Sequence, residues 1–204
     1  LLSYNDEGEI VPDLAESYQI SSDNKTYTIH LRDNLFWHDG EPITSEDMLF
    51  TIRAIQNPQY KSVFRANWQG VNVETLDEKT IRFTLRNPYA PFVENLTIGI
   101  LPKHLWSIIK PDQAPLHELN LEPIGSGPYM FYSLKKSREG LITSYKLVRY
   151  KNYYKDGPYI KNIHFLFLTI SEAFLLRSNG SDLSSTEDFN LFFPTSLLET
   201  GLDI

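Results

Sequence analysis

Two stretches in the first half of the chain alternate apolar and polar residues, which is the pattern of a strand with one buried face. In residues 17–32, the apolar Tyr27, Ile29 and Leu31 alternate with polar residues after a polar run at residues 21–25. Residues 76–86 repeat this scheme, with Asp, Lys, Thr, Leu and Arg at matching places. Each stretch therefore predicts a β-hairpin. Both hairpins need a turn former followed by alternation, so we favour this shared requirement over internal duplication as the cause of the repeat.

A helix is predicted between the two hairpins. Apolar residues recur at three- and four-residue spacings over residues 48–55, which places them on one helical face. Thr44 and Asp47 can form a variant capping box, so the helix is expected to begin near Ser45. Pro58 cannot continue a helix and predicts its end.

The rest of the chain predicts shorter elements. Residues 60–70 are expected to form an irregular loop, and short helices are expected after it near residues 88–92 and 101–106. Three strands are then predicted at residues 128–135, 141–150 and 162–168, followed by a short helix at residues 171–177. Residues 179–204 mix turn formers with apolar patches and match no single element. The pattern is that of a mixed α/β protein.

Composition excludes several classes of protein. The 204 residues are 41% hydrophobic and 22% charged, which is typical of a folded globular chain with one large core or two small ones. A net charge of −7 argues against a duplex nucleic-acid partner and a polybasic membrane contact. The absence of cysteine excludes disulfides, thiolate nucleophiles and Cys-ligated zinc. The chain begins without methionine or a signal sequence, so we expect a fragment or a processed piece.

His38 and Asp39 place an imidazole beside a carboxylate, which is compatible with a general base or with one metal ligand. A metal site needs further ligands at matched spacing, but the other four histidines are scattered along the chain. Asp39 is followed by Gly40, a pair typical of turns. We therefore favour a turn and expect neither a metal nor a cofactor.

Gly125, Ser126 and Gly127 form a small-residue run before a predicted strand. The run lacks the lysine of a phosphate loop, and its glycines do not have the Gly-x-Ser-x-Gly spacing of a serine nucleophile elbow. A tight turn or hinge is the favoured interpretation. Glycines at this place would also allow the main chain to approach a ligand closely.

Arg65, Asn67 and Trp68 lie in the predicted loop, where no periodicity explains a large aromatic residue. Two interpretations of Trp68 stay open. An exposed indole beside an arginine can serve as a ligand platform, and packing against the neighbouring helix explains the residue equally well.

Several motifs, in this order, resemble the family 5 extracellular solute-binding proteins, which are the oligopeptide and dipeptide receptors of bacterial ABC importers. The motifs are GEIVPDLAESY at residues 8–18, FWHDGEPITSED at 36–47, NPYAPF at 87–92, ILPKHLW at 100–106, PIGSGPY at 123–129 and NYY at 152–154. The match weakens beyond residue 171. Because the motifs are many and ordered, the resemblance is specific.

The resemblance implies a mixed α/β, periplasmic-binding-protein-like type II fold with two lobes. This chain would be the N-terminal half, covering most of one lobe with its inserted subdomain. Residues 1–16 would enter lobe I, residues 17–122 would form the inserted subdomain, and residues 123–204 would return to lobe I. Gly125, Ser126 and Gly127 are then the first candidates to line the ligand cleft, and Arg65, Asn67 and Trp68 are the second.

The function implied by the resemblance is capture of a small solute, with oligopeptides as the favoured class, for delivery to a membrane permease. No catalysis, nucleic acid or cofactor is expected, and the receptor should be a monomer. Its expected place is the cell envelope, either periplasmic or lipid-anchored on the outer face of the cytoplasmic membrane. The first alternative is a cytoplasmic solute-sensing domain of a transcription regulator. A hydrolase that uses either His38 with Asp39, or Ser126, is the second, but no third residue is placed to orient a base.

Overall fold

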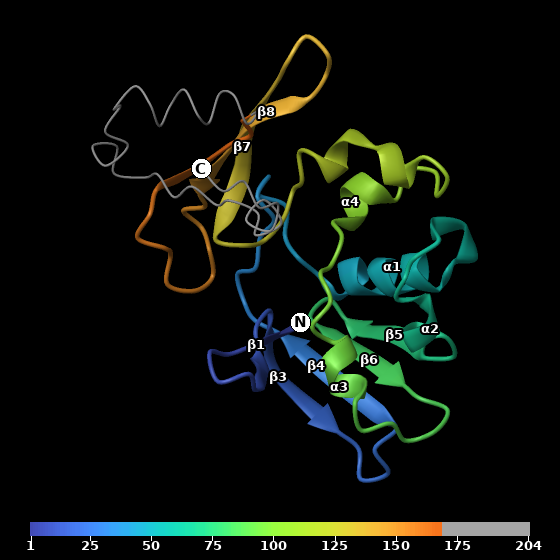
Figure 1. Cartoon of the computed structure of the whole chain (residues 1–204). Helices are drawn as coiled ribbons and strands as arrows, with labels where there is room; N and C mark the ends of the chain where they lie inside the picture. Colours follow the sequence, from blue (N-terminus) through green and yellow to red (C-terminus); the bar gives the residue numbers. More distant parts are fainter. Residues whose placement is uncertain (169–204) are drawn as a thin grey trace, which may run out of the picture. The chain divides into compact units, whose positions relative to one another are not determined.

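A computed structural model describes residues 1–168 of the chain (Figure 1). It divides into two compact units. The first unit consists of Leu1–Met130 and Tyr150–Gly157, and the second consists of Phe131–Arg149 and Pro158–Ile204, which is described as far as residue 168. These units have other bounds than the three segments that the resemblance implies. Those segments concern the lobes of a longer receptor and stay a prediction.

The first unit contains both predicted hairpins. Its strands are β1 (Leu2–Tyr4), β2 (Ile10–Pro12), β3 (Ala15–Ile20), β4 (Thr26–Leu31), β5 (Asn72–Asp77) and β6 (Thr80–Thr84). β1 pairs with β2, and the other four form an antiparallel sheet in the order β3-β4-β6-β5 (Figure 1). The two hairpins are therefore confirmed, and they meet through β4 and β6.

The repeat in the sequence corresponds to a symmetric pairing of these hairpins. Thr28 of β4 pairs with Arg82 of β6 at the centre of the arrangement. On one side the N–H of Leu31 donates to the carbonyl oxygen of Lys79, and on the other the N–H of Leu85 donates to that of Lys25, both at 2.8 Å. Leu31 and Leu85 hold equivalent places in the repeat, and so do Lys25 and Lys79. The two bonds are therefore equivalent. The repeat thus places the same turn and the same alternation on both sides of the sheet's centre.

The predicted helix is α1 (Ser45–Gln56), and its capping box is confirmed. A carboxylate oxygen of Asp47 accepts from the N–H of Thr44 at 2.9 Å, while the other accepts from the N–H of Lys103 at 2.8 Å. Asp47 therefore caps α1 and ties it to a distant segment.

Three single-turn helices follow: α2 (Arg65–Trp68), α3 (Phe92–Asn95) and α4 (Lys103–Trp106). The last two lie where short helices were predicted. α2 falls in the stretch expected to be irregular, so that prediction was wrong there. A single turn is too short to leave a periodic pattern in the sequence.

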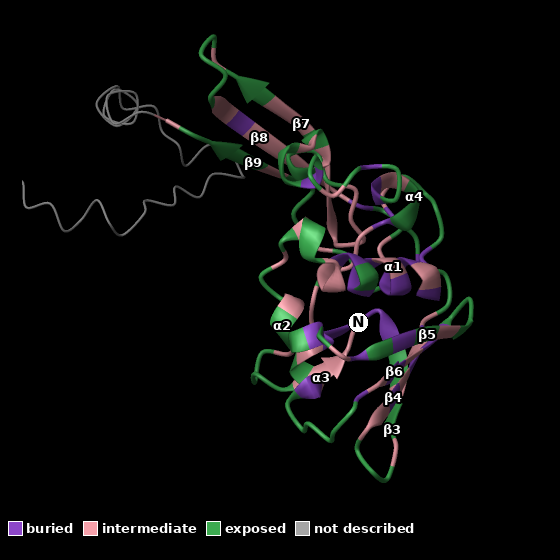
Figure 2. Ribbon diagram, turned by 90° about the vertical axis from the view of Figure 1, so that its right-hand side faces the viewer, coloured by how far each residue is buried: buried purple, intermediate pink, exposed green. Residues whose placement is uncertain are grey.

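The core of the first unit lies between α1 and one face of the four-stranded sheet (Figure 2). Ile29 of β4 and Ile81 and Phe83 of β6 are buried on that face, as their alternation with polar neighbours predicts. Met48 and Ile52 of α1 are buried in the same cluster. Burying each such side chain contributes about 1.5–3 kcal/mol, so this layer supplies much of the unit's stability.

The segment Tyr150–Gly157 belongs to the first unit although it follows two strands of the second. The hydroxyl of Tyr154 donates to a carboxylate oxygen of Asp13 at 2.9 Å, and Lys155 forms an ion pair with the same carboxylate. These contacts attach the segment to Asp13, which directly follows β2 near the start of the chain.

The three predicted strands are β7 (Tyr129–Lys136), β8 (Ile142–Arg149) and β9 (Asn162–Leu166), in the sheet order β7-β8-β9. They form the second unit, except that the first two residues of β7 belong to the first. β8 and β9 run antiparallel. The helix predicted at residues 171–177 and the unassigned residues 179–204 lie outside the described part. Among residues 1–168, no helix has the length and apolar character that a bilayer span requires.

Candidate functional site

The side chain of His38 lies against the main chain of residues 125–127. Its Nδ1 accepts a hydrogen bond from the N–H of Gly125 at 3.2 Å, and its Nε2 lies 3.0 Å from the carbonyl oxygen of Gly127. A carbonyl oxygen only accepts, so Nε2 carries the proton and the ring is the neutral tautomer. The backbone N–H of His38 also donates to the carbonyl oxygen of Gly125 at 2.8 Å. One residue thus holds both glycines.

The surroundings of His38 favour this neutral state. Burial lowers the pKa of the ring below its ordinary value of 6.5, and the bond to Gly127 and the charge of Asp39 oppose this only in part. A proton on Nδ1 would point at the N–H of Gly125 and break that bond. Hydrogen bonding and burial therefore act in the same direction.

Tyr150 completes the arrangement from a third part of the chain. Its ring meets that of His38 edge-on, with the ring centres 4.8 Å apart. Its hydroxyl donates to the carbonyl oxygen of Trp37 at 2.9 Å, and its N–H donates to that of Pro128 at 2.9 Å. Tyr150 was not singled out in the sequence, where it is only the last residue of a predicted strand. We call the set Trp37, His38, Gly125, Ser126, Gly127 and Tyr150 the glycine-loop site.

The two glycines of this site differ in what surrounds them, although neither has a positive φ. A Cβ added to Gly125 would lie 3.3 Å from Cε1 of His38, which is tighter than ordinary contact. A Cβ added to Gly127 would meet no atom within 4 Å. The contact with His38 accounts for glycine at position 125. Neither backbone conformation nor packing within residues 1–168 accounts for it at position 127, where the main chain borders open space.

The chemistry of a hydrolase finds little support in this geometry. Both ring nitrogens of His38 are engaged by main-chain groups, so neither is free to take a proton from Ser126. The carboxylate of Asp39 lies 2.8 Å from Nε2 of His104 and is paired there instead. Residues 1–168 contain no group of three or more histidine or acidic side chains that could hold a metal ion.

The second group of candidates is divided by the structure. Trp68 is 1% exposed, and its ring packs against Phe83 and Phe92 with ring centres 5.7 and 5.4 Å away. Of the two interpretations of Trp68, packing in the core is the one that describes this position. Arg65 is half-buried and donates through Nε to the carbonyl oxygen of Gln56 at 3.1 Å, while the exposed Asn67 donates to the side chain of Asn95 at 3.3 Å.

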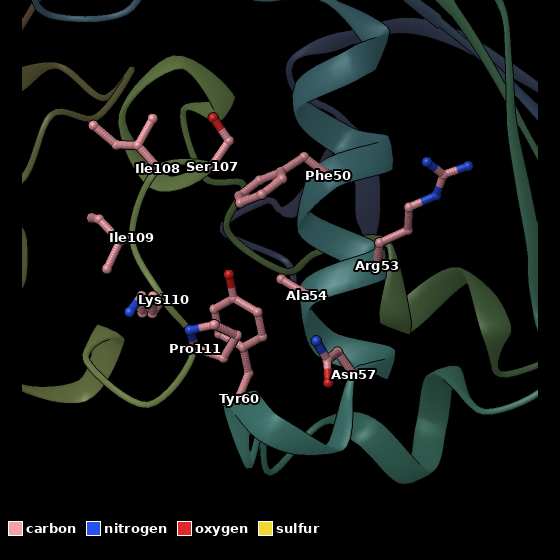
Figure 3. A pocket seen from close by; sticks show the side chains of 10 residues that line it. All are labelled: Phe50, Arg53, Ala54, Asn57, Tyr60, Ser107, Ile108, Ile109, Lys110 and Pro111. Atoms are coloured by element: carbon pink, nitrogen blue, oxygen red, sulfur yellow. The ribbon is translucent and has the colours of Figure 1, made fainter.

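Two hollows open on the surface of the first unit. One has a volume of about 400 Å³, and Figure 3 shows Phe50 and Tyr60 facing it across from Ile108 and Ile109, while Arg53 points away. The other has a volume of about 530 Å³ and lies beside Gly70 and Arg86. Neither hollow includes residues 125–127, and sequence reasoning singled out no residue that lines them.

Comparison with known proteins identifies the family. The model of the bacterial extracellular solute-binding proteins, family 5 Middle, matches residues 9–186. A putative ABC transporter peptide-binding protein of Brucella ovis is 42% identical over 135 residues, covering 64% of this chain and 25% of that protein. The nickel-binding periplasmic protein of Escherichia coli is 33% identical over 169 residues, or 81% of this chain and 30% of that protein.

A solved structure agrees with these sequence matches. The crystal structure of NikZ from Campylobacter jejuni in complex with Ni(L-His) matches with a TM-score of 0.75 and 32% identity, over 88% of this chain and 35% of that one. The chain thus spans between a quarter and about a third of the length of these relatives. The match confirms the expected fold class, a mixed α/β part of a periplasmic binding protein. The chain belongs to the bacterial extracellular solute-binding proteins, family 5.

Proposed function

We propose that the protein containing this chain is the substrate-binding component of an ABC importer. It captures a small solute in a cleft between two lobes and delivers it unchanged to a membrane permease. We infer that the solute is an oligopeptide, as the peptide-binding name of the Brucella ovis relative suggests. The observation that carries the proposal is the open space beside Gly127, whose main chain is held in place by His38.

A fixed and open stretch of main chain suits a receptor for varied peptides. Peptide N–H and C=O groups are the same in every oligopeptide, so bonds to them give affinity without demanding one side chain. Because His38 holds the loop before the solute arrives, little entropy is lost on binding. Closure of a second lobe would remove water and strengthen each polar contact.

The roles of the candidate residues follow from their positions. Gly125, Ser126 and Gly127 are proposed to line the cleft, with Gly127 offering its main chain to the solute. Arg65 and Asn67 are proposed as secondary contacts because both retain exposed surface. Trp68 is proposed to act from the core, where it supports α2 without touching the solute.

A cytoplasmic sensor of a transcription regulator would bind solute in the same way but would act on DNA. The names of the relatives favour the importer, since one is an ABC transporter protein and another is periplasmic. We accordingly propose the cell envelope as the protein's location and ABC permease subunits as its partners. One relative is named for nickel binding, so a nickel complex is the solute against which the peptide proposal is tested.

The proposal is tested by titrating the complete natural protein with pools of di- to pentapeptides, using calorimetry and thermal shift. Nickel with L-histidine serves as the comparison solute. We expect at least one peptide pool to raise the melting temperature and to release or absorb heat on binding. If no pool changes the melting temperature or gives heat of binding, peptides are excluded as the solute. They are likewise excluded if only nickel with L-histidine gives a response.

A further inference from the structure

We propose that His38 is a positioning residue of the solute site: its neutral ring holds residues 125–127 in the binding conformation, and protonation of the ring releases them. The inference rests on the proposed function in one respect, namely that this loop contacts the solute. Its consequence is a receptor that binds less tightly as the surroundings become acidic.

The geometry makes one bond of the hold depend on a single proton, namely the bond from the N–H of Gly125 to Nδ1 of His38. Gly125 and Gly127 have no side chains with which to pack the loop in place, so its fixed shape depends on main-chain contacts. His38 supplies an acceptor to one glycine and a donor to the other, and only the neutral ring can do both. A proton on Nδ1 would make this atom a donor that faces the N–H of Gly125, and the N–H would lose its acceptor on the ring.

The groups that face His38 do not cancel this effect. Asp39 is the adjacent carboxylate and favours the protonated ring, but it is also paired with His104. Tyr150 presents a ring edge and stays uncharged, because burial raises the pKa of its hydroxyl. Burial of the ring lowers the pKa of His38 by more than the charge of Asp39 raises it. The ring therefore stays neutral near pH 7.

Two substitutions separate the two bonds. In His38→Gln, the terminal amide can still donate to the carbonyl oxygen of Gly127 but the acceptor for Gly125 is lost. In His38→Asn, the side-chain oxygen can still accept from the N–H of Gly125 but the donor to Gly127 is lost. Neither side chain titrates, so both variants should lose the pH dependence while each keeps one of the contacts.

The first experiment needs no solute. The complete natural protein is labelled with 15N at histidine and glycine, and its NMR spectra are followed between pH 8 and 5, with His38 assigned from the spectrum of His38→Gln. We expect His38 to be the Nε2-protonated tautomer at pH 7.5. The amide resonances of Gly125 and Gly127 should then shift with the same midpoint as the ring. Amide resonances that stay unchanged while His38 titrates would overturn the proposal.

The second experiment adds an equimolar pool of di- to pentapeptides and measures affinity at pH 7.5 and 5.5. For the wild type, we expect a loss that begins below pH 6.5 and reaches at most about tenfold at pH 5.5, the limit for a ring with an ordinary pKa. The two variants should bind with nearly equal affinity at both pH values. An equally large loss in the variants would overturn the link to His38. If the pool is silent at every pH, the peptide proposal fails, and the NMR titration alone decides the role of His38.

Discussion

The hydroxyl of Tyr150 donates to the carbonyl oxygen of Trp37 across 113 positions of sequence, at a distance of 2.9 Å. Trp37 immediately precedes His38, so this bond fixes the peptide group from which the imidazole projects. The ring of Tyr150 also contacts that of His38. A residue at the end of a strand therefore helps to orient the side chain that holds the glycine loop.

Removing this hydroxyl should destabilise the protein. Tyr150→Phe removes one of two donors to the buried carbonyl oxygen of Trp37, which keeps its bond from the N–H of Gly40 at 2.9 Å. We therefore expect the free energy of unfolding to fall by about 0.5–1.5 kcal/mol in a urea titration of the complete protein. Tyr159→Phe is the matched control, because Tyr159 is 99% exposed and should tolerate the change. Equal effects of the two substitutions would contradict the importance of the Trp37 contact.

The two glycines should respond differently to alanine. Gly125→Ala pushes a methyl group against His38 and should lower the free energy of unfolding by about 1–3 kcal/mol, as for other overpacked sites. Gly127→Ala meets no atom, so we expect a stability within about 1 kcal/mol of the wild type. Its peptide affinity should fall, because the methyl group fills the space that we assign to solute. Calorimetry with the peptide pools checks this, and unchanged affinity would place the solute elsewhere.

Asp47 should matter more to stability than its neighbour Glu46. Asp47 is 4% exposed and accepts from two backbone N–H groups, so Asp47→Ala should lower the free energy of unfolding by about 2–4 kcal/mol. Glu46 forms a partly exposed ion pair with Lys103, and Glu46→Ala should cost less than about 1 kcal/mol. Urea titration of both variants gives the comparison. A larger loss for Glu46→Ala would contradict the capping role of Asp47.

Stability should decline in mild acid because of His38. Its pKa is lowered in the folded protein, so the unfolded chain binds the proton more readily. The contribution of His38 is therefore complete above pH 6.5, the ordinary value, and is lost as the pH falls through the folded value. Urea midpoints measured from pH 7.5 to 5 should show this decline in the wild type and a shallower one in His38→Gln. Parallel curves for the two proteins would argue against a neutral, half-buried His38.

Much of the local structure was predictable, because its causes lie within a few residues. Alternation and turn formers identified the two hairpins and the strands β7, β8 and β9. Three- and four-residue spacing together with the Thr44 and Asp47 pair identified α1 and its start. The family resemblance, drawn from ordered motifs, was confirmed by the match over residues 9–186. α2 escaped notice because one turn of helix leaves no period.

The glycine-loop site depended on contacts that no local pattern contains. Residues 125–127 were singled out as a turn near a ligand and His38 as part of another turn, but their bonds join positions 87 and 89 apart. Trp68 had two open interpretations, and burial against Phe83 and Phe92 assigned it to the core. Periodicity reports which face of an element is apolar. Folding alone brings distant groups within hydrogen-bond distance, and so determines which ring nitrogen carries a proton and which glycine borders open space.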